Sequence, residues 1–202
     1  MRRVSLETTA VVTMELQRGI CGDLASIEPL GDAMVERGIA PCVGRLVVAA
    51  REAGLAIVHC TFSLRPDRLG TDMSLPLLRA AWSDPSYLLE GTASTELLPE
   101  IVPDSSDIIC NRHHGVSPFA GTDLDATLRR RGIDTVVVAG VSLNVGITGL
   151  AIEAVNHGYK VFVASDAVIG VPIAYGDDVL RNSLAPIATL AKVDDLIAAL
   201  AQ

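Results

Sequence analysis

Short apolar runs alternate with longer helical patterns along the chain. The apolar runs are rich in Val and Ile and are apolar on both faces, which is typical of strands in a parallel sheet that is covered on both sides. The predicted strands are residues 9–14, 56–60, 107–110, 135–139, 160–164 and 188–191.

Between these strands the apolar residues recur at helical spacing. In residues 40–53, for example, Val43, Leu46, Val47 and Ala50 share one face, and Gly54 follows as a stop signal. The other predicted helices are residues 123–131, 145–156, 172–184 and 194–200. The alternation predicts one domain over residues 1–202, a three-layer α/β/α Rossmann-like fold whose doubly wound, mainly parallel sheet has about six strands.

Two segments fit this alternation poorly. Residues 19–37 follow the first strand, and residues 63–103 contain five prolines and the only tryptophan, Trp82. Long connections in compact domains often form lids over a site or arms at an interface. An irregular surface excursion is an equally good interpretation of both segments.

The predicted sheet topology by itself indicates where a ligand should bind. In an open α/β sheet, ligands bind beyond the carboxyl ends of the strands, near the point where the strand order reverses. The segments that matter are therefore Glu15 to Gln17 after the first strand, Arg112 to His114 after the third, and residues 140–146 after the fourth.

The amino-acid composition limits the classes of molecule that this protein is expected to bind. The chain of 202 residues has a formal net charge of -8 and only 3% aromatic residues, which argues against nucleic-acid binding. The basic run 129–131 ends a predicted helix, where cations are favoured. No apolar run reads as a membrane span, and the opening Met1-Arg2-Arg3 does not indicate a signal peptide. We expect a cytoplasmic protein with a small-molecule substrate.

The four cysteines, Cys21, Cys42, Cys60 and Cys110, show no C-x-x-C spacing. This usage is typical of free thiols in a reducing compartment, and it does not suggest zinc. We expect neither a metal nor another cofactor.

Three motifs lie at the three predicted strand ends. The first is the apolar strand that ends in Glu15-Leu16-Gln17. The second is the stretch from His113 to Phe119, followed by Thr122-Asp123-Leu124. The third is the Val-rich strand that leads through Gly140-Val141-Ser142 to Gly146. In this order and spacing the motifs resemble those of the isochorismatase-like superfamily of cysteine hydrolases, from about Thr9 to Asp166.

The resemblance implies a catalytic triad of Asp, Lys and Cys. Those three positions hold Glu15, His113 and Gly146 in this chain. Since glycine has no side chain, Gly146 cannot form the thioester on which amidases of the superfamily depend.

The resemblance also implies an oxyanion hole made by the backbone N–H groups of Gly146 and Ser142, with a cis peptide bond between Val141 and Ser142. Amides at the start of a helix can bind an anion or a carbonyl without any thiol. Further contacts with substrate are expected from five residues: Gln17, Arg112, Phe119, Val141 and Asn144.

The residues that replace the triad keep acid/base capacity. Glu15 lies in an apolar run, and burial raises the pKa of a carboxyl, which favours a general acid. His113 titrates near neutrality and can pair with Glu15. Arg112 can clamp a carboxylate. A purely structural Glu15, paired with Arg112, His113 or a backbone donor, is the competing interpretation.

Nicotinamidases of the superfamily carry a D-x-H metal motif after the second strand, and residues 59–65 contain none. His59 falls inside the predicted strand, where a core histidine with its hydrogen bonds satisfied is the simpler interpretation.

Three functions remain open. The first is isochorismatase-like cleavage of a vinyl ether, in which Glu15 protonates the substrate. The second is water-mediated hydrolysis of a C–N or C–O bond by Glu15 and His113. The third is a catalytically inactive member that binds a small ligand or acts as an assembly partner. Because superfamily members often share their site between subunits, a homodimer or homotetramer is expected.

Overall fold

Six parallel strands form one sheet in the computed structural model, which describes residues 6–25, 28–71, 74–81 and 84–200. Trp82 and Met1-Arg2-Arg3 lie outside the described residues. The strand order is β3-β2-β1-β4-β5-β6. The bounds are β1 Thr9–Met14, β2 Ala56–Phe62, β3 Ile108–Arg112, β4 Thr135–Gly140, β5 Lys160–Val168 and β6 Thr189–Ala191. The predicted fold class is confirmed.

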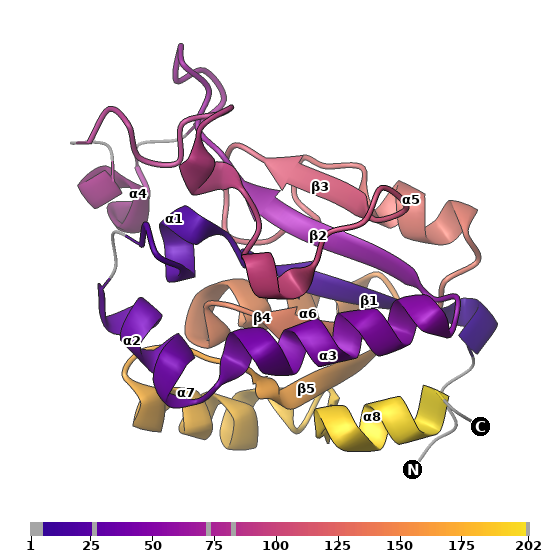
Figure 1. Cartoon of the computed structure of the whole chain (residues 1–202). Coiled ribbons are helices and arrows are strands. Elements are labelled where there is room, and N and C mark those ends of the chain that lie inside the picture. The colour runs from indigo at the N-terminus through magenta and orange to yellow at the C-terminus, as the bar shows by residue number, and fades with distance from the viewer. Residues whose placement is uncertain (1–5, 26–27, 72–73, 82–83, 201–202) are drawn as a thin grey trace.

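Helices cover both faces of the sheet (Figure 1). Two of them, α3 (Ile39–Glu52) and α8 (Val193–Leu200), pack on one face, while α5 (Leu124–Arg130) and α6 (Thr148–Asn156) pack on the other. The remaining helices are α1 (Arg18–Cys21), α2 (Glu28–Glu36), α4 (Pro76–Ala81) and α7 (Ile173–Val179). Among the described residues, no helix has both the length and the apolarity to cross a bilayer.

The strand order reverses at β1, which pairs with β2 on one side and with β4 on the other. Strands β2 and β4 belong to different halves of the doubly wound sheet, so the carboxyl end of β1 is the topological switch point. Glu15 follows β1 directly, Arg112 is the last residue of β3, and Ser142 lies two residues beyond β4.

Several predicted elements differ at their ends. Strands β2 and β3 each continue two residues further than predicted, and β5 continues to Val168 after a register shift against β4. The helix predicted from residue 145 begins earlier, with a π-helical turn over Leu143–Ile147, because the Ile147 N–H donates to the Ser142 carbonyl five residues back. The poorly fitting segments contain α1, α2 and α4 and two short 3-10 turns, Ala93–Thr95 and Pro99–Ile101.

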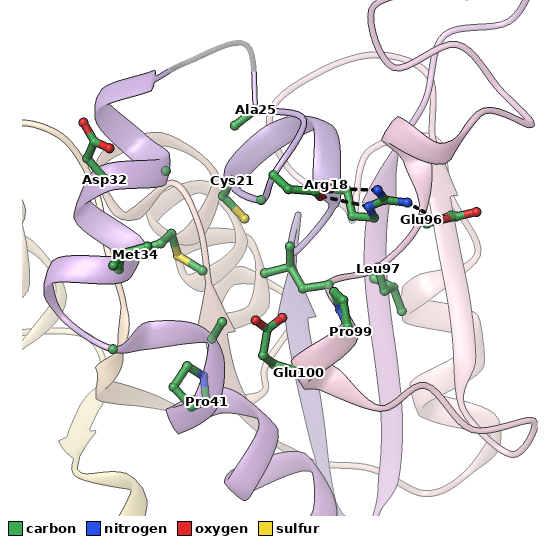
Figure 2. Close-up of a pocket in the computed structure, with 17 residues that line it drawn as sticks. Arg18, Cys21, Ala25, Asp32, Met34, Pro41, Glu96, Leu97, Pro99 and Glu100 are labelled. Atoms are coloured by element: carbon green, nitrogen blue, oxygen red, sulfur yellow. Dashed lines mark hydrogen bonds and ion pairs between the residues drawn. The ribbon is translucent and has the colours of Figure 1, made fainter.

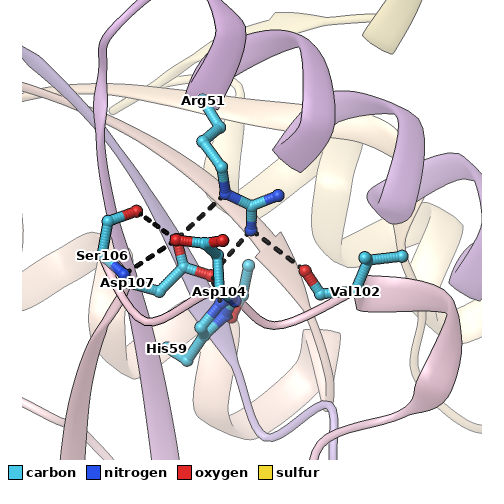
Figure 3. A network of polar contacts seen from close by, with 7 residues as sticks. Arg51, His59, Val102, Asp104, Ser106 and Asp107 are labelled. Atoms are coloured by element: carbon cyan, nitrogen blue, oxygen red, sulfur yellow. Dashed lines mark hydrogen bonds and ion pairs between the residues drawn. The ribbon is translucent and has the colours of Figure 1, made fainter.

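A buried polar network ties β1, β2 and the start of β3 to the end of α3 (Figure 3). The His59 ring is fully buried, with Nδ1 at 2.7 Å from Thr13 Oγ1 and Nε2 at 3.2 Å from Asp107 Oδ2. Arg51 Nη2 donates to the same Asp107 oxygen at 2.7 Å. The interpretation of His59 as a satisfied core histidine is confirmed.

The charges of this network follow from its surroundings. Burial lowers the pKa of His59, although Asp107 opposes that shift. Burial also opposes ionisation of Asp107, but hydrogen bonds from Arg51, the Asp104 amide and His59 lower its pKa. The network therefore consists of a neutral imidazole between a hydroxyl and a carboxylate, with Arg51 supplying the positive charge.

This network predicts how stability depends on pH. The pKa of His59 in the folded protein lies below its unfolded value of about 6.5, so the unfolded chain gains a proton first as the pH falls. The free energy of unfolding should therefore decrease from pH 7 toward pH 5. Urea unfolding of wild type and His59→Gln at both pH values measures this, and an equal decrease in both proteins contradicts the assignment.

Candidate active site

A cavity of about 400 Å³ lies at the carboxyl ends of β1, β3 and β4. Its polar lining comes from the three strand ends and from the segment that precedes β3. These polar residues are Glu15, Asp84, Tyr87, Arg112, Ser142 and Asn144. Its apolar lining is aliphatic apart from one ring: Ile20, Leu30, Phe62, Leu77, Leu78, Leu88, Val116, Val145 and Val171. The predicted location of the ligand site and the observed cavity coincide.

Glu15 leaves the line of the strand at the edge of this cavity. Its backbone has a φ of 52°, in the left-handed region that residues other than glycine rarely occupy. The Glu15 N–H donates to the Cys60 carbonyl at 2.8 Å, and the Glu15 carbonyl accepts from the Gln17 N–H at 2.9 Å. These bonds to β2 and to the following turn fix the backbone from which the carboxylate enters the cavity.

Arg112 forms an ion pair with the Glu15 carboxylate through Nη2. The guanidinium is almost entirely buried and lies over the Phe62 ring, with 5.2 Å between the guanidinium carbon and the ring centroid. Its Nη1 is 3.5 Å from the Thr61 carbonyl oxygen, while Nε has no hydrogen-bond partner among the described residues. Arg112 is thus committed to the Glu15 carboxylate, and one of its buried donors is left without a partner among the described residues.

His113 does not contact Glu15. Its Nδ1 donates to the Ser63 carbonyl at 2.8 Å, and its own carbonyl accepts from the Thr71 hydroxyl at 2.7 Å. The ring does not line the cavity. The contact expected between Glu15 and His113 is therefore made by Arg112, because neighbouring side chains of an extended strand point in opposite directions and β3 continues to residue 112.

The turn after β4 supplies the opposite wall of the cavity. The peptide bond between Val141 and Ser142 is cis, as the sequence predicts. The Ser142 hydroxyl donates to Asn144 Oδ1 at 2.6 Å, and the Ser142 carbonyl accepts from the N–H groups of Val145 and Ile147. Ser142, Asn144 and Gly146 all line the cavity at the start of the π-helical turn.

The missing side chain lets the backbone of Gly146 pack closely beside the Glu15 carboxylate. A Cβ atom on Gly146 would lie 3.5 Å from Glu15 Oε2, 3.2 Å from the Val141 carbonyl oxygen and 2.9 Å from Met14 Cε. The closest of these atoms is the mobile tip of a methionine side chain, which can move aside. The position that the resemblance assigns to the nucleophile therefore faces Glu15.

Three of the expected substrate contacts have other partners in the structure. The Gln17 amide is fully buried and bonds the Phe62 backbone and the Thr95 carbonyl. Phe119 stacks on His157 with 4.9 Å between ring centroids, and Val141 is fully buried. None of the three lines the cavity. Gln17 instead holds β1 against β2 and the loop before β3.

The poorly fitting segment 63–103 forms part of the cavity wall. Five of its residues line the cavity: Leu77, Leu78, Asp84, Tyr87 and Leu88. Burial and the negative charge of Glu15 raise the pKa of Tyr87 to about 12. The prolines and the length of this segment were the available signal, and they left a lid, an interface arm and a surface excursion open without specifying which side chains face the site.

No cysteine lines this cavity in the described part of the chain. Cys60 and Cys110 are buried register partners on β2 and β3, and burial raises the pKa of Cys21 to about 12. The described residues also contain no cluster of three His, Cys, Asp or Glu side chains that could hold a metal ion.

A second, larger hollow of about 1080 Å³ lies between α1, α2 and the segment 96–100 (Figure 2). Arg18 is its prominent side chain, and its guanidinium is bound by both Asp23 and Glu96 at 2.8 Å. None of the residues Glu15, Arg112 and Gly146 lines it. The chemistry-bearing groups at the strand ends thus belong to the smaller cavity.

Comparison with known proteins assigns the family. The isochorismatase domain model matches residues 9–195. The chain belongs to the isochorismatase family. It is 28% identical to the isochorismatase family protein YecD of Escherichia coli O157:H7 over 99% of this chain and all of that protein. It is 31% identical to YwoC of Bacillus subtilis over 82% of this chain and 79% of that protein.

Solved structures agree with this assignment. An isochorismatase family protein from Burkholderia thailandensis superposes with a TM-score of 0.80 at 27% identity, covering 99% of this chain and 98% of that one. A cysteine hydrolase from Pseudomonas syringae pv. phaseolicola has a TM-score of 0.83 at 23% identity, covering 100% and 96%, which supports the fold alone. The protein is an isochorismatase-family hydrolase.

The glycines of the β4 turn give a matched pair for testing this geometry. Gly140 has a φ of 119°, and a Cβ there would lie 2.2 Å from the Met14 carbonyl oxygen, so Gly140→Ala should cost about 2–4 kcal/mol of unfolding free energy. Gly146→Ala would place its Cβ 2.9 Å from the Met14 tip and 3.2 Å from the Val141 carbonyl oxygen, so it should cost less, about 1–2 kcal/mol. Denaturant unfolding of both variants checks this, and equal costs contradict the described turn.

Proposed function

We propose that this protein hydrolyses a small molecule without a cysteine nucleophile, with Glu15 as the acid/base group and Arg112 as the residue that positions it. The observation that carries the proposal is the ion pair between the two side chains inside a cavity that also contains Ser142 and Gly146. Glu15 and Gly146 both line this cavity of about 400 Å³, which is large enough for a small substrate and a water molecule near the carboxylate.

In the proposed reaction Glu15 acts on water. Its carboxylate accepts a proton from a water molecule as that water attacks the carbonyl carbon of the substrate. The backbone N–H groups of Ser142 and Gly146 stabilise the negative charge that develops on the carbonyl oxygen. Protonated Glu15 then donates its proton to the departing nitrogen or oxygen, which regenerates the carboxylate and releases the acid and the amine or alcohol.

Vinyl-ether cleavage is the second candidate, since it also needs no nucleophilic side chain. That reaction requires Glu15 to begin as a proton donor, whereas an ion pair with a guanidinium is a contact made by the ionised carboxylate. The contact therefore favours hydrolysis by activated water.

The relatives also support cleavage of a C–N bond. The chain is 25% identical to the maleamate amidohydrolase of Pseudomonas putida over 61% of this chain and 56% of that protein. It is 27% identical to the N-carbamoylsarcosine amidase of Thermoplasma acidophilum, with a TM-score of 0.71 and coverage of 93% and 97%. The proposed substrate group is therefore an amide, a carbamoyl group or a small ester.

The proposal predicts a large effect at Glu15. Loss of the proton acceptor in Glu15→Gln should lower kcat/KM by about 100-fold or more for any substrate that the wild type hydrolyses. Amides, N-carbamoyl compounds, small esters, lactones and isochorismate form the substrate panel. Glu96→Gln, which changes a carboxylate paired with Arg18 at the other hollow, is the matched control and should retain activity.

The outcomes of this panel separate the alternatives. Undiminished turnover by Glu15→Gln contradicts the assigned role of the carboxylate. Turnover of isochorismate alone favours the vinyl-ether reaction. A wild type that turns over no member of the panel supports the catalytically inactive family member.

Thiol independence has a separate test. Iodoacetamide treatment should leave wild-type kcat/KM within about 2-fold, because no cysteine lines the cavity among the described residues. In Gly146→Cys the new thiol faces the cavity, so the same treatment should block substrate entry and abolish whatever activity that variant retains. Loss of wild-type activity on alkylation contradicts the proposal.

A further inference from the structure

The cavity is poor in positive charge. Its charged lining side chains in the described part of the chain are Glu15, Arg112 and Asp84. The Arg112 charge is neutralised by Glu15, so the pair contributes no net charge to the cavity. Asp84, which is solvent-exposed, adds one negative charge, and hydrogen bonds from the Ser86 hydroxyl and amide lower its pKa and keep it ionised.

The single positive charge of Arg112 is already paired with Glu15. Arg112 is 4% exposed and is held by Glu15, the Thr61 carbonyl and the Phe62 ring. A substrate carboxylate at Arg112 would either displace Glu15 or lie beside it as a second negative group, and both arrangements are costly in a partly buried site.

The rest of the lining is apolar. Aliphatic side chains and the Phe62 ring form most of the wall, and the Tyr87 hydroxyl is a neutral donor close enough to Glu15 to feel its charge. A carboxylate placed against such a wall loses its hydration without gaining a cation. An uncharged, apolar part of a ligand loses little hydration energy there and gains contact with the apolar side chains.

We infer that the substrate of this site is an uncharged molecule with an apolar body and one hydrolysable carbonyl group, and that carboxylate-bearing analogues are rejected. The inference rests on the proposed function and narrows its substrate class. It separates this chain from the relatives named as maleamate and ureidoacrylate amidohydrolases, because both of those compounds carry a carboxylate at the end opposite their amide or carbamoyl group.

Two amides of equal length test the inference. Hexanamide ends in a methyl group, and the monoamide of adipic acid carries a carboxylate at the same place. Their dissociation constants for the wild type are measured by ligand-observed NMR, and ammonia release is measured in parallel. Hexanamide should bind in the millimolar range or better, and the adipic acid monoamide at least about 10-fold more weakly at low salt.

Two variants move the preference in predictable directions. Asp84→Asn removes the negative charge at the rim, and binding of the acidic amide should tighten about 3-fold or more while hexanamide binding stays constant. Glu15→Gln frees the Arg112 guanidinium, so the acidic amide should become the better ligand. Asp84→Asn changes an exposed side chain, and it keeps the test valid if Glu15→Gln does not fold.

The results distinguish the two proposals. Equal or tighter wild-type binding of the acidic amide overturns the inferred substrate class, as does failure of hexanamide to bind in the millimolar range. Binding of hexanamide without ammonia release overturns the proposed hydrolysis of amides and leaves the charge preference standing. Hydrolysis with a preference for the acidic amide keeps the hydrolase and removes the uncharged substrate.

Discussion

The ion pair between Glu15 and Arg112 is the interaction on which the site depends. It joins the ends of β1 and β3, which lie on opposite sides of β2 in the sheet, and it fixes the one carboxylate that faces Gly146. Arg112 is buried against Phe62, so neither partner can leave without exposing an unpaired charge to a low-dielectric surrounding. The same pairing consumes the only cation that lines the cavity among the described residues, so the proposed chemistry and the inferred charge of the ligand both depend on it.

The fold could be predicted because its strands are apolar on both faces. Strand β1 has its predicted bounds, and the cis peptide bond at Val141–Ser142 lies where the resemblance implies it. The partner of Glu15 could not be predicted, because it depends on where β3 ends. The expected end at Cys110 leaves the orientation of the next residues open, whereas continuation to Arg112 places that side chain on the same face as Cys110 and turns His113 toward Ser63.

The cavity wall from residues 63–103 was beyond sequence analysis for a different reason. Its helix α4 is short, and Asp84 and Tyr87 belong to no periodic pattern. Their position at the site depends on hydrogen bonds between residues far apart in the sequence. The Glu90 N–H donates to the Leu64 carbonyl, and the Gln17 amide donates to the Thr95 carbonyl. Local secondary-structure propensity does not predict such contacts, so the sequence indicated only that a long connection lies near the site.

In the proposed reaction a water molecule, positioned by the Glu15 carboxylate, takes the place of a thiol. Such a reaction forms no covalent intermediate between the protein and its substrate. Intact-protein mass spectrometry during turnover of the best substrate tests this most directly. The protein mass should stay unchanged while product accumulates, whereas a mass increase equal to the acyl group of the substrate would contradict the account.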